Sequence, residues 1–304
     1  MANHIRDIVV RDHRLDPVES EVWITVEPEE RTETTRIGGR LMGPRCPYSS
    51  TVEVAYPLRP WNKEQGENDV ENLTMRVIIP EASPWEPETP FLYDGPLELW
   101  RGDAKLDERR VSYGLRSLAL RRKGLVLNGK PFSFRGVKVS HLDEGQARRL
   151  HDAQFNLLYA PVTGDDDALW QLADRYGFFV LGQVDAASDD RYWFVEERLN
   201  PHTCAFGWVL PQIVLEQRQL WHTAVSVLRG HRQQLLLGIK LDEPFTGVLP
   251  GEVSFVVCAE QLLPELAATK LAKIVLVTEI RENAPAERSS DNLVIGRVSK
   301  HAPS

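Results

Sequence analysis

The fold is decided between Phe132 and Gly182, where short apolar segments alternate with stretches of helical pattern. The residues FSFRGVKV (132–139) and FNLLY (155–159) flank DEGQARRLHDAQ (143–154), which places Ala147, Leu150 and Ala153 on one helical face. A third apolar segment, FFVLG (178–182), follows a stretch with an acidic first turn that Gly177 ends. Strands separated by helices predict β-α units and a mostly parallel sheet.

Further apolar segments continue this pattern to the end of the chain. They are Trp208–Leu210, Leu235–Leu241, Val253–Cys258, Ile274–Thr278 and Leu293–Val298. With the first three they make eight strands, which predicts a (β/α)8 barrel. Only about 175 residues follow Gly129, fewer than the ~200 at the lower end for this fold, so we expect a compacted barrel. The shortened or absent outer helices are expected after strands five to seven.

The amino-terminal part of the chain follows a different period. Apolar and polar residues alternate, turn-forming residues interrupt them about every ten positions, and 11 of the 20 prolines precede residue 100. The segments of this kind are Glu21–Val26, Thr51–Tyr56, Leu73–Ile79, Leu97–Trp100 and Val111–Leu118. We therefore predict an immunoglobulin-like β-sandwich over residues 1–120 and the TIM-like barrel over 121–304. Limited proteolysis is expected to cut, if anywhere between the domains, within Arg121–Gly129.

Composition excludes several functional classes. The chain has 36 Lys and Arg against 44 Asp and Glu, a formal net charge of −8, so we expect no nucleic-acid partner. No apolar run approaches the ~20 residues of a membrane helix, so no membrane association is expected either. Three widely spaced cysteines fit a reducing, cytoplasmic location. We found no phosphate-binding glycine loop and no histidine pair at metal-ligand spacing, which predicts no cofactor and no metal.

Three motifs near the domain junction carry a family resemblance. They are PWEPETPFLY (84–93), VSYGLR (111–116) and LNGKPFSFRGV (127–137), and in this order they resemble glycoside hydrolase family 2, the β-galactosidase and β-glucuronidase family. The resemblance implies an immunoglobulin-like domain leading into a catalytic barrel. It also implies a retaining mechanism, which needs two carboxylates about 5–5.5 Å apart.

Of the family's two catalytic positions, the resemblance implies that this chain lacks the acid/base carboxylate and keeps a candidate nucleophile. The family's acid/base is the Glu of an Asn-Glu pair ending strand four, where this chain has Gln212 and Ile213. An isoleucine transfers no proton, and a missing general acid typically costs 10²–10⁴-fold in rate. Glu279 ends a segment that resembles the nucleophile strand. Glu216 and Glu243 are weak candidates for a replacement acid/base.

Other expected mouth residues also lack the family's charges. Tyr159 is offered in place of the arginine that the family usually has after the asparagine of strand two. Gln183 aligns with the family's acidic residue at the end of strand three. The predicted substrate-binding residues are Asn156, Tyr159, Gln183, Trp208 and Gln212.

These replacements predict a pseudo-glycosidase that serves as a carbohydrate-binding or protein-interaction module. The alternatives are a residual retaining β-glycosidase using Glu279, and a structural subunit. We also predict a homo-oligomer or a protein partner, because a compacted barrel leaves apolar faces uncovered, particularly at Val248–Val257 and Leu262–Leu271.

Overall fold

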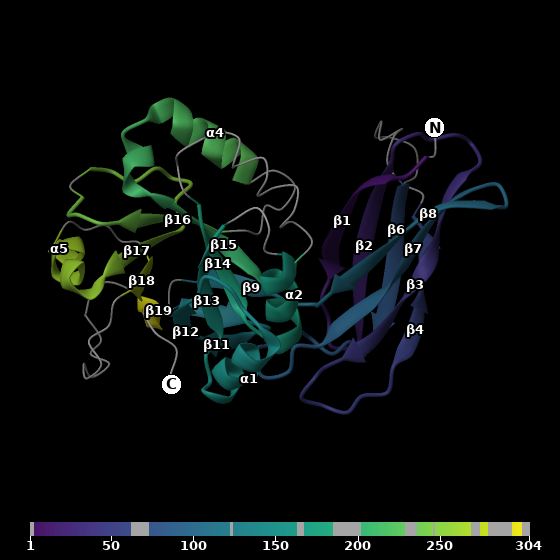
Figure 1. Ribbon diagram of the computed structural model, residues 1–304, viewed down its shortest axis with the longest axis horizontal. Helices are drawn as coiled ribbons and strands as arrows, with labels where there is room; N and C mark the ends of the chain where they lie inside the picture. Colours follow the sequence, from purple (N-terminus) through teal and green to yellow (C-terminus); the bar gives the residue numbers. More distant parts are fainter. Residues whose placement is uncertain are drawn as a thin grey trace. The chain divides into compact units, whose positions relative to one another are not determined.

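The computed structural model divides the chain into two compact units, whose elements are labelled in Figure 1. It describes residues 3–61, 73–121, 124–162, 167–184, 202–228, 236–245, 247–268, 274–278 and 294–299. The first unit comprises Met1–Ser117 with Pro201–Thr203, and the second comprises Leu118–Asn200 with Cys204–Ser304.

The first unit is an antiparallel sandwich, as predicted. One sheet has the order β1-β2-β6-β5 and the other β4-β3-β7-β8. The bounds are β1 (Ile5–Arg14), β2 (Glu19–Pro28), β3 (Thr35–Arg45), β4 (Val54–Pro57), β5 (Arg59–Pro60), β6 (Leu73–Pro80), β7 (Leu92–Arg101) and β8 (Ala104–Tyr113).

Strict alternation explains why β2 forms a half-buried strand. Val22, Ile24 and Val26 are completely buried in the core between the sheets, while the residues between them are partly exposed. The sequence-based prediction missed β1 and β3. In β1 the sequence IRDIVVRDHR alternates poorly, and β3 contains Gly38 and Gly39, so neither shows the period-two pattern.

The stretch Arg121–Gly129, where proteolysis is expected to cut, if anywhere between the domains, is structured where it is described. Strands β9 (Leu118–Arg121), β10 (Gly124–Leu127) and β11 (Lys130–Phe132) form a small antiparallel sheet. Leu125 and Leu127 of β10 are buried. The sequence does not predict β10, because its short length hides its alternating pattern.

The second unit contains a closed, eight-stranded parallel barrel, which confirms the predicted fold class. Its order is β12-β13-β14-β15-β16-β17-β18-β19, and β19 pairs with β12 to close the ring. The bounds are β12 (Phe134–Lys138), β13 (Leu157–Pro161), β14 (Phe179–Gln183), β15 (Ala205–Pro211), β16 (Leu236–Leu241), β17 (Phe255–Ala259), β18 (Ile274–Thr278) and β19 (Val294–Ser299).

The outer helices are uneven in length. They are α1 (Glu144–Asp152), α2 (Asp167–Tyr176), α4 (Arg218–Leu228) and α5 (Leu263–Ala268), with 3-10 helices η1 (Gln212–Leu215) and η2 (Glu260–Leu262). The Asp143 side chain caps α1 by accepting the Gln146 N–H. Residues 242–245 and 247–254 after β16 form no helix, and α5 has six residues, which confirms the expected shortening after strands five and six. None of the described helices is long and apolar enough to cross a membrane.

Phenylalanines fill the amino-terminal end of the barrel. The rings of Phe134 and Phe206 come from non-adjacent strands, and their centroids lie 4.6 Å apart, so they meet across the interior. Phe179 and Phe255 pack on these rings at 5.4 and 5.5 Å. A β-carbon at Gly238 would lie 2.4 Å from the Phe255 ring, so the glycine makes room for it. Side chains therefore fill the amino-terminal end of the barrel, and polar groups are expected at the carboxyl-terminal end.

Candidate functional site

Gln212 joins the carboxyl ends of two adjacent barrel strands. It directly follows β15 as the first residue of η1, and its side-chain Oε1 accepts the backbone N–H groups of Asp242 and Glu243 at 3.2 and 3.3 Å. Those two residues directly follow β16. Gln212 therefore lies at the predicted end of the barrel, and its carbonyl oxygen is already used to position the loop after β16.

An ion pair stands beside this connection. The Lys240 ammonium lies 2.6 Å from a carboxylate oxygen of Asp242, and both side chains are partly exposed. Positions two apart on a strand point to the same side, which explains why these side chains meet. In the sequence, Asp242 and Glu243 form an acidic pair after a predicted strand, and the two-residue spacing between Lys240 and Asp242 is the signal that could have indicated the ion pair.

Tyr159 is the most unusual polar residue of the site. It belongs to β13 and is 3% exposed, and its hydroxyl is buried without a hydrogen-bond partner among the residues that the structure describes. Burial, followed by the nearby Asp242 charge, raises the pKa of this hydroxyl far above its ordinary value. Tyr159 is therefore a neutral phenol whose O–H can donate a hydrogen bond.

The residues after β15 and β16 are largely solvated. Ile213 is 47% exposed. Glu216 follows η1 and is exposed, as is Glu243. Gln183 ends β14 and is partly exposed. Glu279, the predicted nucleophile, lies outside the described residues.

Two predicted substrate-binding residues lie elsewhere. Asn156 precedes β13 at the amino-terminal end of the barrel, where its side chain accepts the Arg135 N–H and donates to the Ser133 carbonyl. It is a structural link between strand starts. Trp208 is 2% exposed, and its ring packs 5.7 Å from that of Trp170 on α2. Its ring is buried between strand and helix and presents no open face for a sugar.

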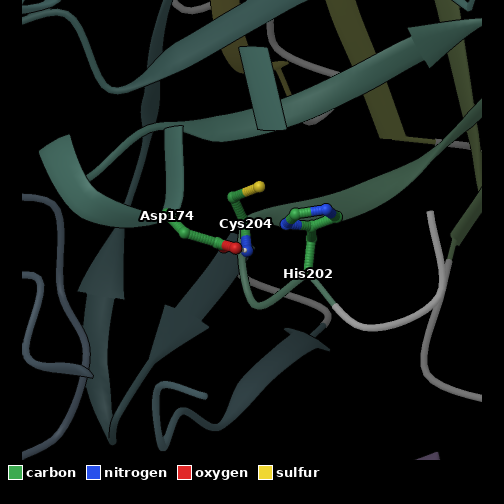
Figure 2. A group of neighbouring side chains, drawn as sticks. All are labelled: Asp174, His202 and Cys204. Carbon is green, nitrogen blue, oxygen red and sulfur yellow. Dashed lines mark hydrogen bonds between the residues drawn. The ribbon is translucent and has the colours of Figure 1, made fainter. Parts of the chain in front are cut away.

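A buried pair that the sequence did not predict consists of Asp174 and Cys204, both in the second unit (Figure 2). The Asp174 carboxylate accepts the Cys204 backbone N–H at 2.6 Å, and the Cys204 thiol donates to the Trp170 carbonyl at 3.5 Å. These bonds tie α2 to the start of β15, so the carboxylate and the thiol both have structural roles.

Comparison with known proteins gives one family throughout. The family model for glycosyl hydrolases family 2 matches residues 3–116. A beta-galactosidase from Klebsiella pneumoniae (strain 342) is 26% identical over 172 residues, covering 46% of this chain and 16% of the relative. A beta-galactosidase from Bacteroides ovatus is 26% identical over 195 residues, covering 54% of this chain and 23% of the relative. The chain thus spans less than a quarter of these relatives.

Solved structures show the same fold at lower identity. A glycosyl hydrolase family 2 member from Bacteroides cellulosilyticus matches 98% of this chain and 44% of its own, with a TM-score of 0.70 and 15% identity. A Bacteroides uniformis beta-glucuronidase matches 98% of this chain and 46% of its own, with a TM-score of 0.71 and 12% identity. At such identities the likeness establishes the fold alone.

Proposed function

We propose that this chain, a relative of the glycosyl hydrolases of family 2 in sequence and in fold, binds carbohydrate at the carboxyl-terminal end of its barrel without hydrolysing it. The observation that carries the proposal is the end of β15. There Gln212 is engaged with the loop after β16, and the next residue, Ile213, projects into solvent. Neither side chain can protonate a leaving group.

The described carboxylates nearby do not supply an obvious replacement. Glu216 stands beyond η1 and is exposed. Glu243 is also exposed, although its backbone N–H is held by Gln212. A general acid needs a raised pKa, which burial or a neighbouring negative charge provides. We infer that the polar groups at this end serve binding.

The test measures binding and turnover on the same protein. Calorimetry with methyl β-glycosides should detect binding, while p-nitrophenyl β-galactoside, β-glucuronide and β-mannoside should not be hydrolysed above background. Turnover that disappears in Glu279→Gln would instead support the residual retaining β-glycosidase. Release of one equivalent of nitrophenol without turnover would show a surviving nucleophile with no acid/base, because the glycosyl-enzyme intermediate would accumulate.

One argument for the protein-interaction alternative, an uncovered apolar face at Leu262 and Leu266, does not hold. Leu262 and Leu266, expected on an uncovered apolar face, are 8% and 4% exposed within a single chain. A homo-oligomer or a protein partner stays a proposal, now without an apolar surface at these leucines. Sedimentation at micromolar concentration tests it, since an assembly would exceed the 34.5 kDa of one chain.

A further inference from the structure

Two arginines stand opposite each other on one sheet of the first unit, the sheet with the order β1-β2-β6-β5. Arg59 of β5 and Arg76 of β6 are register partners, so their side chains share a face. Arg76 is also the register partner of Trp23 on β2. Val22 and Ile24, on either side of Trp23, are buried in the core, so the shared face is the outer one. Like charges directly opposite each other destabilise a sheet unless an anion lies against them.

Aromatic rings surround the arginine of β6. The Arg76 guanidinium lies 5.2 Å from the centroid of the Trp61 ring. Trp61 continues the pairing of β5, because its backbone N–H donates to a β6 carbonyl at 2.9 Å. Its ring lies 5.3 Å from that of Trp23, on which the His13 ring stacks at 4.0 Å. Stacking on an indole orients the planar guanidinium and leaves its N–H groups available to an acceptor.

The acid nearest to these rings in the sheet is already engaged. The Glu21 carboxylate, two residues from Trp23 on the same face, accepts the indole N–H of that tryptophan at 2.8 Å. Within the part of the chain that the structure describes, neither of the opposed arginines forms an ion pair with an acid. The arginine of β5 is exposed and that of β6 is partly exposed. Two cations without a counter-charge are a local exception in a chain of net charge −8.

The shape and the residue types of this face indicate what could lie against it. The outer face of a sheet is open, whereas sites for small molecules are concave. Tryptophan and arginine are the residue types that carry much of the binding energy in protein interfaces. A guanidinium matches a carboxylate in both charge and geometry. The face therefore fits a protein segment that is rich in Asp and Glu.

We propose that the surface formed by Arg59, Arg76, Trp61, Trp23 and His13 docks an acidic segment of a protein partner. The two guanidinium groups donate to carboxylates of the partner, and these carboxylates offset the repulsion between the opposed arginines. The indole rings pack against the methylene groups of the bound side chains. The inference concerns the first unit alone and does not depend on carbohydrate binding by the barrel.

Fluorescence anisotropy with a labelled deca-glutamate peptide tests this inference on the full chain at low ionic strength. The peptide should bind, and its affinity should fall as salt screens the charges. Arg59→Gln and Arg76→Gln should each weaken binding several-fold. Arg36→Gln is the matched control, because Arg36 lies 4.8 Å from the centroid of its register partner Trp100 on the other sheet, without a second arginine opposite. This control should leave the affinity unchanged.

Protein stability provides a readout that needs no ligand. Arg59→Gln removes one of two opposed like charges, so it should raise the urea midpoint of the free protein. Arg36→Gln removes no opposed charge and should not raise the midpoint. A lower midpoint for Arg59→Gln would show that Arg59 has a stabilising partner within the chain, and the proposal would be overturned.

The binding outcomes are equally decisive. If the peptide does not bind, or binds the two single arginine variants as tightly as the native chain, the proposed surface is wrong. Equal weakening by Arg36→Gln would indicate a diffuse attraction to the whole sandwich and would also overturn the proposal. Binding of heparin without binding of deca-glutamate would assign the surface to a sulfated polysaccharide and exclude the acidic protein segment.

Discussion

Replacing Tyr159 by phenylalanine should stabilise the unliganded protein. The substitution removes a single oxygen that is buried and has no hydrogen-bond partner among the described residues. Leaving such a group unsatisfied costs about 1–3 kcal/mol. The lost dispersion contacts of one oxygen, at about 0.1–0.2 kcal/mol per atom pair, offset part of this gain. We expect the free energy of unfolding to rise by about 1 kcal/mol.

A second tyrosine provides the matched control. Tyr93 is equally buried, but its hydroxyl accepts the Ser83 backbone N–H at 2.8 Å. Tyr93→Phe deletes the same atom and leaves that N–H without its acceptor, so it should destabilise by about 1–3 kcal/mol. The two substitutions are chemically identical and are expected to have opposite signs.

Urea unfolding followed by circular dichroism and tryptophan fluorescence measures both effects, with thermal unfolding as a check. For a unit of this size, about 1 kcal/mol corresponds to a shift of roughly 2–4 °C. If Tyr159→Phe lowers stability by as much as Tyr93→Phe does, the Tyr159 hydroxyl has a hydrogen-bond partner, and the reasoning about its unsatisfied burial is refuted.

Three further substitutions test the packing and its electrostatics. Gly207→Ala would place a β-carbon 2.1 Å from the Leu236 carbonyl oxygen, so the free energy of unfolding, measured in urea, should fall by about 1–3 kcal/mol. Gly251 has open space around its β-carbon position, so Gly251→Ala should leave the stability unchanged. Phe206→Ala should cost about 3–5 kcal/mol, and a loss under 1 kcal/mol in chemical denaturation would contradict the interior packing. The Ile5 N–H lowers the pKa of Asp107, so this carboxylate stabilises the fold above the unfolded-state pKa, and the stabilisation is lost on acidification. Asp107→Asn should therefore be less stable than the native chain at pH 7 but not well below pH 3.8, and a pH-independent difference would argue against this linkage.

The eight barrel strands and the sandwich could be predicted from the sequence because their signals are local. Burial repeats every second residue in β2, and apolar runs of strand length mark the interior of the barrel. Short or irregular strands lack that signal. The polar segment of β1 and the four-residue β10 become strands through pairing with neighbours that the chain supplies elsewhere.

The candidate site depended more heavily on tertiary structure. The sequence by itself determined which residue types follow each strand, including Gln212 and Ile213 after the fourth barrel strand. Only the tertiary structure decided that Gln212 binds the loop after β16, that Asn156 lies at the opposite end of the barrel, and that Trp208 is covered by Trp170. These contacts join residues distant in the chain, and a local pattern specifies a side chain's chemistry without specifying its partner.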